Sequence, residues 1–287
     1  MKSFVKLASL FFVERKQLGT RIALRHTLGF LSLRFKFLIS RDNKLSQLGA
    51  EIRKINLSNK IDELLASTVK YGPFAGLRLT TPHSWHPSNR GNMLLGLYEK
   101  EVVISIVSSS HQKDYFIDIG AADGYFCLGV LAAKLFKHSY SFESTSKGQE
   151  IILANAKLNN LTKQISLFGK AEKNFLANIP KSHVKNSLVL MDIEGAEFDL
   201  LTSDVIENLK GAHLIIELHH MFLDNGNLLL SSLRERVEEM FKIEILEVGS
   251  RDLSGIFEIS NWSDTDRWIL CSEGRPMAPI WWKLTPN

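Results

Sequence analysis

From about residue 93 the sequence alternates short, continuous apolar runs with segments of helical periodicity. Continuous apolar runs are typical of parallel strands that are buried on both faces, and the helical segments provide the crossovers between them. The pattern predicts an α/β fold, a Rossmann-like doubly wound sheet with helices on both faces. The expected strands are 114–119, 138–143, 164–168, 187–192, 213–218, 242–249 and 266–271, the last of them antiparallel. The expected helices are 124–136, 147–159, 196–209 and 228–241.

The first expected strand leads into a turn of small residues, Asp118-Ile-Gly120-Ala121-Ala-Asp123-Gly124. Its two glycines permit a strand-to-helix turn and a close approach of the backbone to a ligand. The second strand ends in Glu143, 25 residues after Asp118. This is the spacing at which a βαβ unit binds a ribose, so the two strands together predict a nucleotide-like pocket.

Acidic residues recur where the expected strands end. Asp118, Glu143, Asp192 with Glu194, and Glu217 follow four of the first five strands, and Gly169-Lys170-Ala171-Glu172 follows the other. One acid after a strand is often only the N-cap of a helix. Because ligands bind outside the carboxyl ends of the strands in open α/β sheets, the repeated placement predicts a binding site at this edge.

The turn disfavours cofactors that carry a pyrophosphate. It lacks the G-x-G-x-x-G pattern of nicotinamide sites, and no Walker turn is present. Carboxylates at 118 and 123 repel pyrophosphate but suit the ammonium and sulfonium groups of S-adenosylmethionine. Glu143 would then hold the ribose hydroxyls, the amides of 120–123 the methionine end, and the loop at Gly169 would flank the adenine.

Four runs resemble the FkbM-like family of class I methyltransferases: 118–125, Phe142-Glu143, Met191-Asp-Ile-Glu-Gly-Ala-Glu197 and Ile216-Glu-Leu-His219. The resemblance covers about residues 93 to 272. It implies a seven-stranded, mostly parallel sheet, S-adenosylmethionine as methyl donor, and O-methylation of a sugar, glycoconjugate or secondary metabolite. The cofactor-binding residues expected on these motifs and strand ends are Asp118, Gly120, Ala121, Asp123, Gly124, Glu143, Ser144, Gly169, Lys170, Ala171 and Asp192.

The fourth strand argues against nucleic acid as the substrate. Methyltransferases that act on adenine or cytosine amino groups need a D/N-P-P-Y/F motif there, whereas this chain has Asp192-Ile-Glu-Gly. Methyl transfer to oxygen needs alignment and removal of a proton. His219, His220 and Asp192 are the predicted catalytic residues, the histidines because imidazole titrates near neutral pH. A histidine that only hydrogen-bonds the backbone or the substrate is the alternative.

Asp192 and Glu194 have two competing interpretations. They can ligate a divalent metal that polarises the acceptor hydroxyl, or, with Glu197, they can cap the following helix and orient pocket groups without a metal. The sequence favours the second, because spacing alone identifies no third or fourth ligand.

The first 92 residues are expected to form a mainly helical extension to a methyltransferase domain at 93–287. Residues 1–45 carry a charge of +8, which leaves −4 for the remainder. Such basic amphipathic helices pack on the main domain as a cap or lie on an anionic membrane surface; the first is the commoner outcome. The turn-rich segment 80–91 contains His83, Trp85 and His86, which are candidates for a lid over the substrate.

Composition places the chain among globular proteins of a reducing compartment. Two cysteines, Cys127 and Cys271, do not make a disulfide framework or a zinc site. No apolar run reaches the roughly 18 residues of a membrane span. We therefore expect a cytoplasmic enzyme, with peripheral membrane contact through residues 1–45 as an option. Its alternative is a catalytically silent methyltransferase-like module that docks on a membrane or a biosynthetic complex.

Overall fold

The computed structural model describes residues 20, 43–81, 87–275 and 277–287. The chain forms two compact units, Met1–Arg53 and Lys54–Asn287. In the first unit the described residues are Thr20 and the beginning of α3 (Asn43–Leu65), whose remainder belongs to the second unit. The basic residues before 43 and the lid candidates His83, Trp85 and His86 lie outside the described residues.

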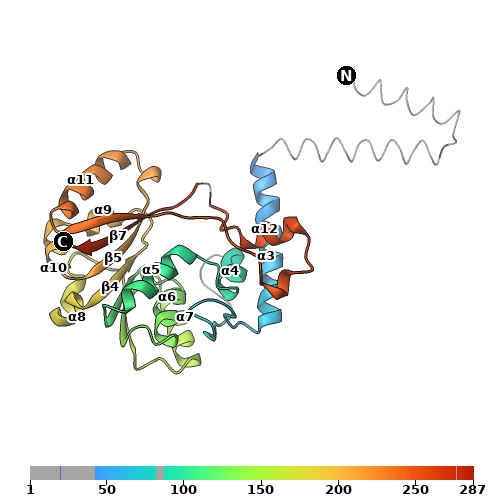
Figure 1. Ribbon diagram of the computed structural model, residues 1–287, viewed down its shortest axis with the longest axis horizontal. Helices are drawn as coiled ribbons and strands as arrows, with labels where there is room; N and C mark the ends of the chain where they lie inside the picture. Colours follow the sequence, from blue (N-terminus) through green and yellow to red (C-terminus); the bar gives the residue numbers. More distant parts are fainter. Residues whose placement is uncertain (1–19, 21–42, 82–86, 276) are drawn as a thin grey trace, which may run out of the picture. The chain divides into compact units, whose positions relative to one another are not determined.

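The second unit contains a seven-stranded sheet of order β3-β2-β1-β4-β5-β7-β6 (Figure 1). The first five strands are parallel, and β7 runs antiparallel to both of its neighbours. The order changes direction between β1 and β4, where open α/β sheets bind their ligands. This topology is that of a class I methyltransferase and confirms the predicted fold class. The strands are β1 (Tyr115–Ile119), β2 (His138–Phe142), β3 (Ile165–Phe168), β4 (Ser187–Met191), β5 (His213–Leu218), β6 (Phe241–Leu246) and β7 (Ile280–Pro286).

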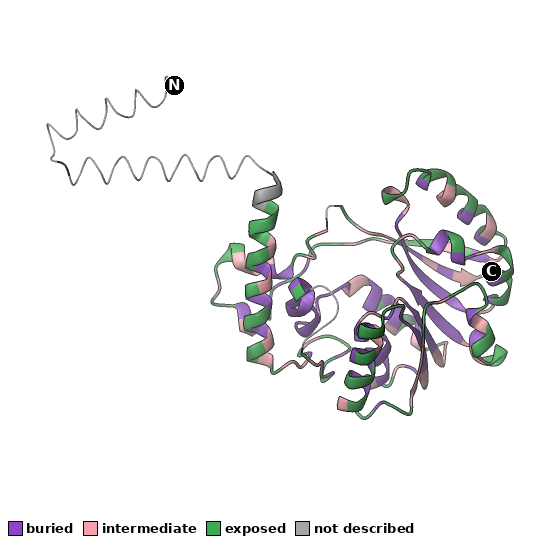
Figure 2. Cartoon of the chain, turned by 180° about the vertical axis from the view of Figure 1, so that it is seen from behind, coloured by how far each residue is buried: buried purple, intermediate pink, exposed green. Residues whose placement is uncertain are grey.

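Alternate residues of the central strands pack into two separate cores, one on each face of the sheet. Phe116 and Leu188 belong to one core, Ile117 and Val189 to the other. The strands are buried on both faces, as Figure 2 shows by colour. The first core also takes side chains from α4 (Arg90–Leu94), α5 (Lys100–Ser110), α6 (Tyr125–Ala132), α7 (Ser146–Leu158) and α12 (Asp264–Cys271). The second takes them from α8 (Lys181–Lys185), α9 (Glu197–Leu200), α10 (Ser203–Asn208) and α11 (Gly226–Glu238).

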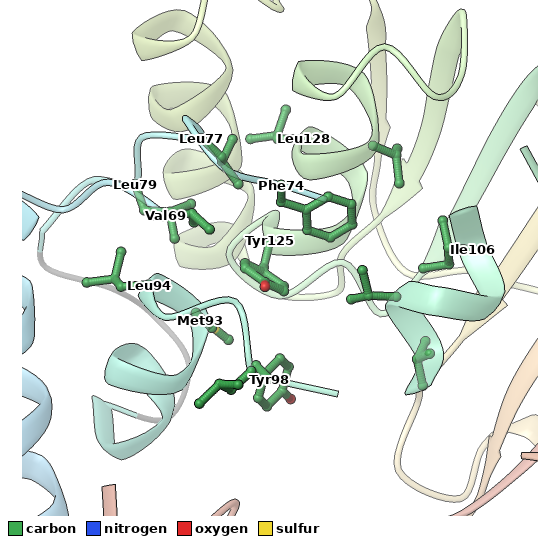
Figure 3. Close-up of a cluster of buried hydrophobic side chains, with 14 of the residues drawn as sticks. Val69, Phe74, Leu77, Leu79, Met93, Leu94, Tyr98, Ile106, Tyr125 and Leu128 are labelled. Atoms are coloured by element: carbon green, nitrogen blue, oxygen red, sulfur yellow. The ribbon is translucent and has the colours of Figure 1, made fainter. Parts of the chain in front are cut away.

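Residues 54–81 and 87–92, grouped with the extension in the sequence analysis, contribute side chains to the first core. Leu57 and Ile61 of α3 are buried there, and so is Phe74 in the loop that follows. Figure 3 shows Phe74 beside Tyr125 of α6, and the two rings meet edge to face with centroids 5.4 Å apart. The compact unit therefore begins at Lys54.

The unit also contains short 3-10 turns: η1 (Pro87–Asn89), η2 (Phe175–Asn178), η3 (His220–Phe222) and η4 (Phe257–Ile259).

The predicted strand at 266–271 is wrong, because this segment lies within helix α12. The Ser263 hydroxyl accepts a hydrogen bond from the Asp266 amide at 3.2 Å and caps the helix. Leu270 and Cys271 are buried while the acidic first turn is exposed, which is an amphipathic helical pattern. The antiparallel strand is instead β7, at the end of the chain.

The predicted helix at 196–209 is two short helices, α9 and α10. Thr202 interrupts them, and its side chain accepts from the Val205 amide as an N-cap. No helix within the described ranges combines the length and the apolar character that a membrane span requires.

Candidate active site

A cavity of about 510 Å³ opens at the carboxyl ends of β1, β2 and β4. Its lining contains carboxylates from three of these strand ends and the backbone of the first turn. The volume lies in the usual range of ligand pockets, roughly 300 to 1,000 Å³. The predicted site residues that line it are Gly120, Ala121, Asp123, Glu143, Ser144, Lys170, Ala171, Asp192 and Glu194.

Asp118, Gly124 and Gly169 are not in the lining. Asp118 is buried beneath the turn and accepts a hydrogen bond from the Cys127 amide at 3.1 Å. It thus holds the first turn of α6. Gly124 is the residue before α6, with φ +90°, and Gly169 is exposed.

The turn after β1 requires glycine at 120. Its φ is +95°, and a Cβ there would lie 1.9 Å from the carbonyl oxygen of Asp192. The turns after β1 and β4 therefore touch, which places Asp192 beside the first turn. Ala122 and Glu194 line the same cavity and also have positive φ, at 51° and 53°. Strained backbone of this kind persists where surrounding structure enforces it, often at functional sites.

Glu143 joins the turns that follow β1 and β2. One carboxylate oxygen accepts from the Ala122 amide at 2.9 Å, and the other accepts from the amide and the hydroxyl of Thr145 at 2.8 and 2.7 Å. The oxygen bound by the Ala122 amide has one donor and retains accepting capacity, whereas the other already has two donors. Glu143 is 7% exposed, so its orientation is fixed before any ligand arrives.

Beside the cavity, carboxylates from several segments surround the ring of His219. Its Nε2 lies 3.5 Å from Glu194 Oε2, 3.7 Å from Asp192 Oδ1 and 3.9 Å from Glu217 Oε1. On the other side of the ring, Nδ1 lies 3.4 Å from Glu197 Oε1. His220 begins η3, which follows β5. Of the two predicted histidines, His219 is the one with these acidic neighbours.

Glu197 connects the turn after β4 with the end of β5. Its side chain is fully buried; one oxygen accepts from the His219 amide at 2.7 Å and the other from the Gly195 amide at 2.9 Å. The last residue of the Asp192–Glu197 motif thereby fixes the position of His219.

Two residues of the site carried no recognised sequence signal. Glu99 precedes α5 and is buried, and Arg275 follows α12. The Arg275 guanidinium forms ion pairs with Glu99 and Glu217, and a third with Glu273 at 3.2 Å. These groups come from segments far apart in the sequence, so no spacing pattern joins them.

Burial and mutual repulsion shift the protonation of this group. Burial, followed by repulsion from Asp192, raises the pKa of Glu217 to about 10, although Arg275 opposes the change. Burial likewise raises the pKa of Asp192. Burial alone would lower the pKa of His219, but Glu197, Asp192 and Glu194 together raise it. A proton is therefore readily held in this cluster near neutral pH.

No protein-family model matches the sequence, and no curated protein matches it. Among solved structures, a tRNA methyltransferase from Aquifex aeolicus is 18% identical, with a TM-score of 0.44 over 65% of this chain and 68% of that one. The C-terminal domain of precorrin-6Y C5,15-methyltransferase from Rhodobacter capsulatus is 12% identical, with a TM-score of 0.39 over 64% and 86%. A Streptococcus pneumoniae protein in complex with S-adenosyl-L-methionine is 13% identical, with a TM-score of 0.39 over 65% and 70%. No substrate is inferred from similarities this distant.

Proposed function

We propose that this chain is an S-adenosylmethionine-dependent O-methyltransferase that acts on a hydroxyl of a sugar, glycoconjugate or secondary metabolite. The observation that carries the proposal is the common cavity: segments after β1, β2, β3 and β4, chosen from the sequence as cofactor-binding, line one pocket of about 510 Å³. At the same edge of the sheet, Asp192 connects that pocket with His219.

The charges around the pocket fit this cofactor. Asp123, Glu143 and Asp192 contribute carboxylates to the lining, which would repel a pyrophosphate and attract an ammonium or sulfonium group. Glu143 is oriented to accept a hydrogen bond from a ribose. The amides of residues 120–122, expected from the sequence to hold the methionine end, donate instead to the Phe142 carbonyl and to Glu143. When bound, S-adenosylmethionine supplies an electrophilic methyl group.

The acceptor hydroxyl belongs at the His219 side of the pocket. There the protein must align the oxygen and take its proton as the new O–C bond forms. Asp192 and His219 are the proposed catalytic groups, since Asp192 borders the pocket and burial raises its pKa, which makes it a better proton acceptor. Glu197 is a positioning residue that acts through His219.

The likeness to FkbM-like enzymes supports oxygen as the acceptor atom. The two most specific motifs, 191–197 and 216–219, meet in the structure through the hydrogen bond between Glu197 and the His219 amide. Motifs that depend on each other in this way are expected of one functional unit rather than of chance matches. Sugar and glycoconjugate hydroxyls are the acceptor class that this resemblance implies.

Calorimetric titration with S-adenosylhomocysteine tests the proposal. We expect a Kd on the order of micromolar for the wild type and a loss of about tenfold to a hundredfold for Glu143→Gln, since one charged hydrogen-bond acceptor is worth about 1.5 to 3 kcal/mol. Glu150→Gln is the matched control, because Glu150 is exposed on the neighbouring α7. Absence of binding to folded wild-type protein would refute the proposed enzymatic function and leave the alternative, a catalytically silent docking module.

A further inference from the structure

The side chains around His219 form a convergent set of metal-binding donors. Asp192, Glu194 and His219 each offer one ligand atom, and these atoms lie within 4.8 Å of one another. They come from the turn after β4 and the end of β5, and Glu217 Oε1 approaches the same ring nitrogen. Spacing alone identified no third ligand in the sequence analysis, and the fold provides one, His219.

The distances suit a shared ion better than hydrogen bonds. His219 Nε2 lies 3.5 to 3.9 Å from three carboxylate oxygens, longer than a normal hydrogen bond. Ligands about 2.1 Å from one ion lie about 3.0 Å apart when adjacent and about 4.2 Å apart when opposite. The observed separations fall between these limits.

The ring of His219 is buried and makes no hydrogen bond within the part of the chain that the structure describes. The side chain is 8% exposed, and Nδ1 has no hydrogen-bond partner there. Asp192 Oδ1, at 3.7 Å from Nε2, is also buried without a partner. Buried polar atoms are nearly always satisfied, so the unpartnered Asp192 oxygen beside Nε2 indicates a missing ligand on that side of the ring.

Glu197 supports the ring in the way that metal-binding histidines are supported. Its Oε1 lies 3.4 Å from Nδ1, on the side away from Asp192 and Glu194. A carboxylate beside one ring nitrogen keeps the proton on that nitrogen. The other ring nitrogen, here Nε2, then presents its lone pair to the ion. The second acidic group, Glu99, Asp192 and Glu217, already has a cation, because Arg275 pairs with Glu99 and Glu217.

We propose that Asp192, Glu194 and His219 bind one divalent cation of the Mn²⁺ type, and that this cation holds the acceptor hydroxyl. The mixed carboxylate and imidazole set suits Mn²⁺ or Zn²⁺ better than Ca²⁺. The function of the ion rests on the proposed methyl transfer. The bound hydroxyl loses its proton to water, its oxygen forms the bond to the methyl carbon, and the carbon–sulfur bond breaks with its electron pair left on sulfur. With the ion bound, Asp192 and His219 serve as ligands and no longer as the proton acceptors.

Titration of the full chain with Mn²⁺, followed by the decrease in the free-ion electron paramagnetic resonance signal, tests the site without any activity assay. We expect one ion per chain, with affinity at least tenfold weaker in Glu194→Gln and in His219→Asn. Glu194 is 64% exposed and forms no hydrogen bond among the described residues, so its replacement leaves the fold intact. Glu235→Gln removes the same charge from the exposed face of α11 and is expected to bind normally.

Affinity that Glu194→Gln and Glu235→Gln leave equal, or no saturable binding by the wild type, would overturn the proposal. Titration with S-adenosylhomocysteine on the same variants separates this outcome from failure of the proposed function. If Mn²⁺ binding depends on Glu194 but the protein binds no S-adenosylhomocysteine, the metal site is supported and its role in methyl transfer is refuted.

Discussion

Asp118 makes the stability of the folded chain dependent on pH. Burial raises its pKa to about 7, although the Cys127 amide donates a hydrogen bond to it. The folded state therefore holds a proton that the unfolded state releases near pH 4, and stability falls as the pH rises from about 4 to about 7. The Asp118→Asn variant cannot ionise at this position. Its stability relative to wild type is expected to improve by about 2 to 3 kcal/mol between pH 5 and pH 8.

Urea denaturation of both proteins at the two pH values measures this difference directly. Any fixed cost of burying the amide cancels, because only the change with pH is compared. If the two proteins differ equally at pH 5 and pH 8, Asp118 is already ionised in the folded state.

Arg275 is expected to be the most important single cation for stability near the site. It neutralises the buried carboxylates of Glu99 and Glu217, which are 2% and 4% exposed. Removing one partner of a buried pair leaves an uncompensated charge and costs about 3 to 5 kcal/mol. Because Arg275 is itself 24% exposed, we expect about 2 to 4 kcal/mol for Arg275→Gln at pH 8.

The Arg234→Gln variant provides the comparison, since Arg234 and Glu238 form an exposed pair on α11. Such pairs contribute about 0 to 1 kcal/mol. Equal unfolding midpoints for the two variants would show that the buried carboxylates tolerate loss of their cation by taking up protons.

The loop at 72–76 and helix α6 fit together through Gly129. A Cβ at Gly129 would lie 2.5 Å from the ring of Phe74, in the cluster of Figure 3. Gly129→Ala is expected to destabilise the protein by about 1 to 3 kcal/mol, as overpacking does, despite the better helix propensity of alanine. Adding Phe74→Leu relieves the contact. The double variant is therefore expected to lose less stability than the two single variants lose together. Additive losses in thermal unfolding would contradict the contact.

How far the sequence predicts an element depends on whether its signal is local. The five parallel strands and α7 were located within a residue or two, because apolar runs and helical periodicity are local features. Segment 266–271 was misassigned since its short apolar run, Arg267-Trp-Ile-Leu-Cys271, fits either structure, and only packing of Leu270 and Cys271 decides.

The same distinction applies to the candidate site. Glycines and acids at strand ends are read directly from the sequence, because the carboxyl ends of parallel strands meet at one edge. Glu99 and Arg275 were missed because they reach this edge from loops beside α5 and α12, through tertiary contacts alone. Glu197 was recognised as part of a motif, but its hydrogen bond to the His219 amide is visible only in the fold.

The candidate cofactor site lies within one of the two units of the chain. Every lining residue of the cavity lies between Met93 and Leu200, within the unit Lys54–Asn287. Deletion of residues 2–42 removes most of the basic residues of the segment 1–45. It is therefore expected to leave the affinity for S-adenosylhomocysteine within about twofold, a change of about 0.4 kcal/mol. Calorimetry on the deleted chain, with circular dichroism to confirm folding, provides the measurement. A folded variant with much weaker binding would mean that the extension helps to form the pocket.

Liposome flotation of the same two proteins tests what the extension itself does. Lysine and arginine near an anionic membrane contribute about 1 kcal/mol each, and this attraction is screened by salt. If the extension lies on membranes, the full chain floats with anionic vesicles at low salt and the deleted chain does not. Equal flotation, together with unchanged cofactor affinity, would assign residues 2–42 neither a membrane role nor a role in the pocket. The methyl donor site would then be complete without them.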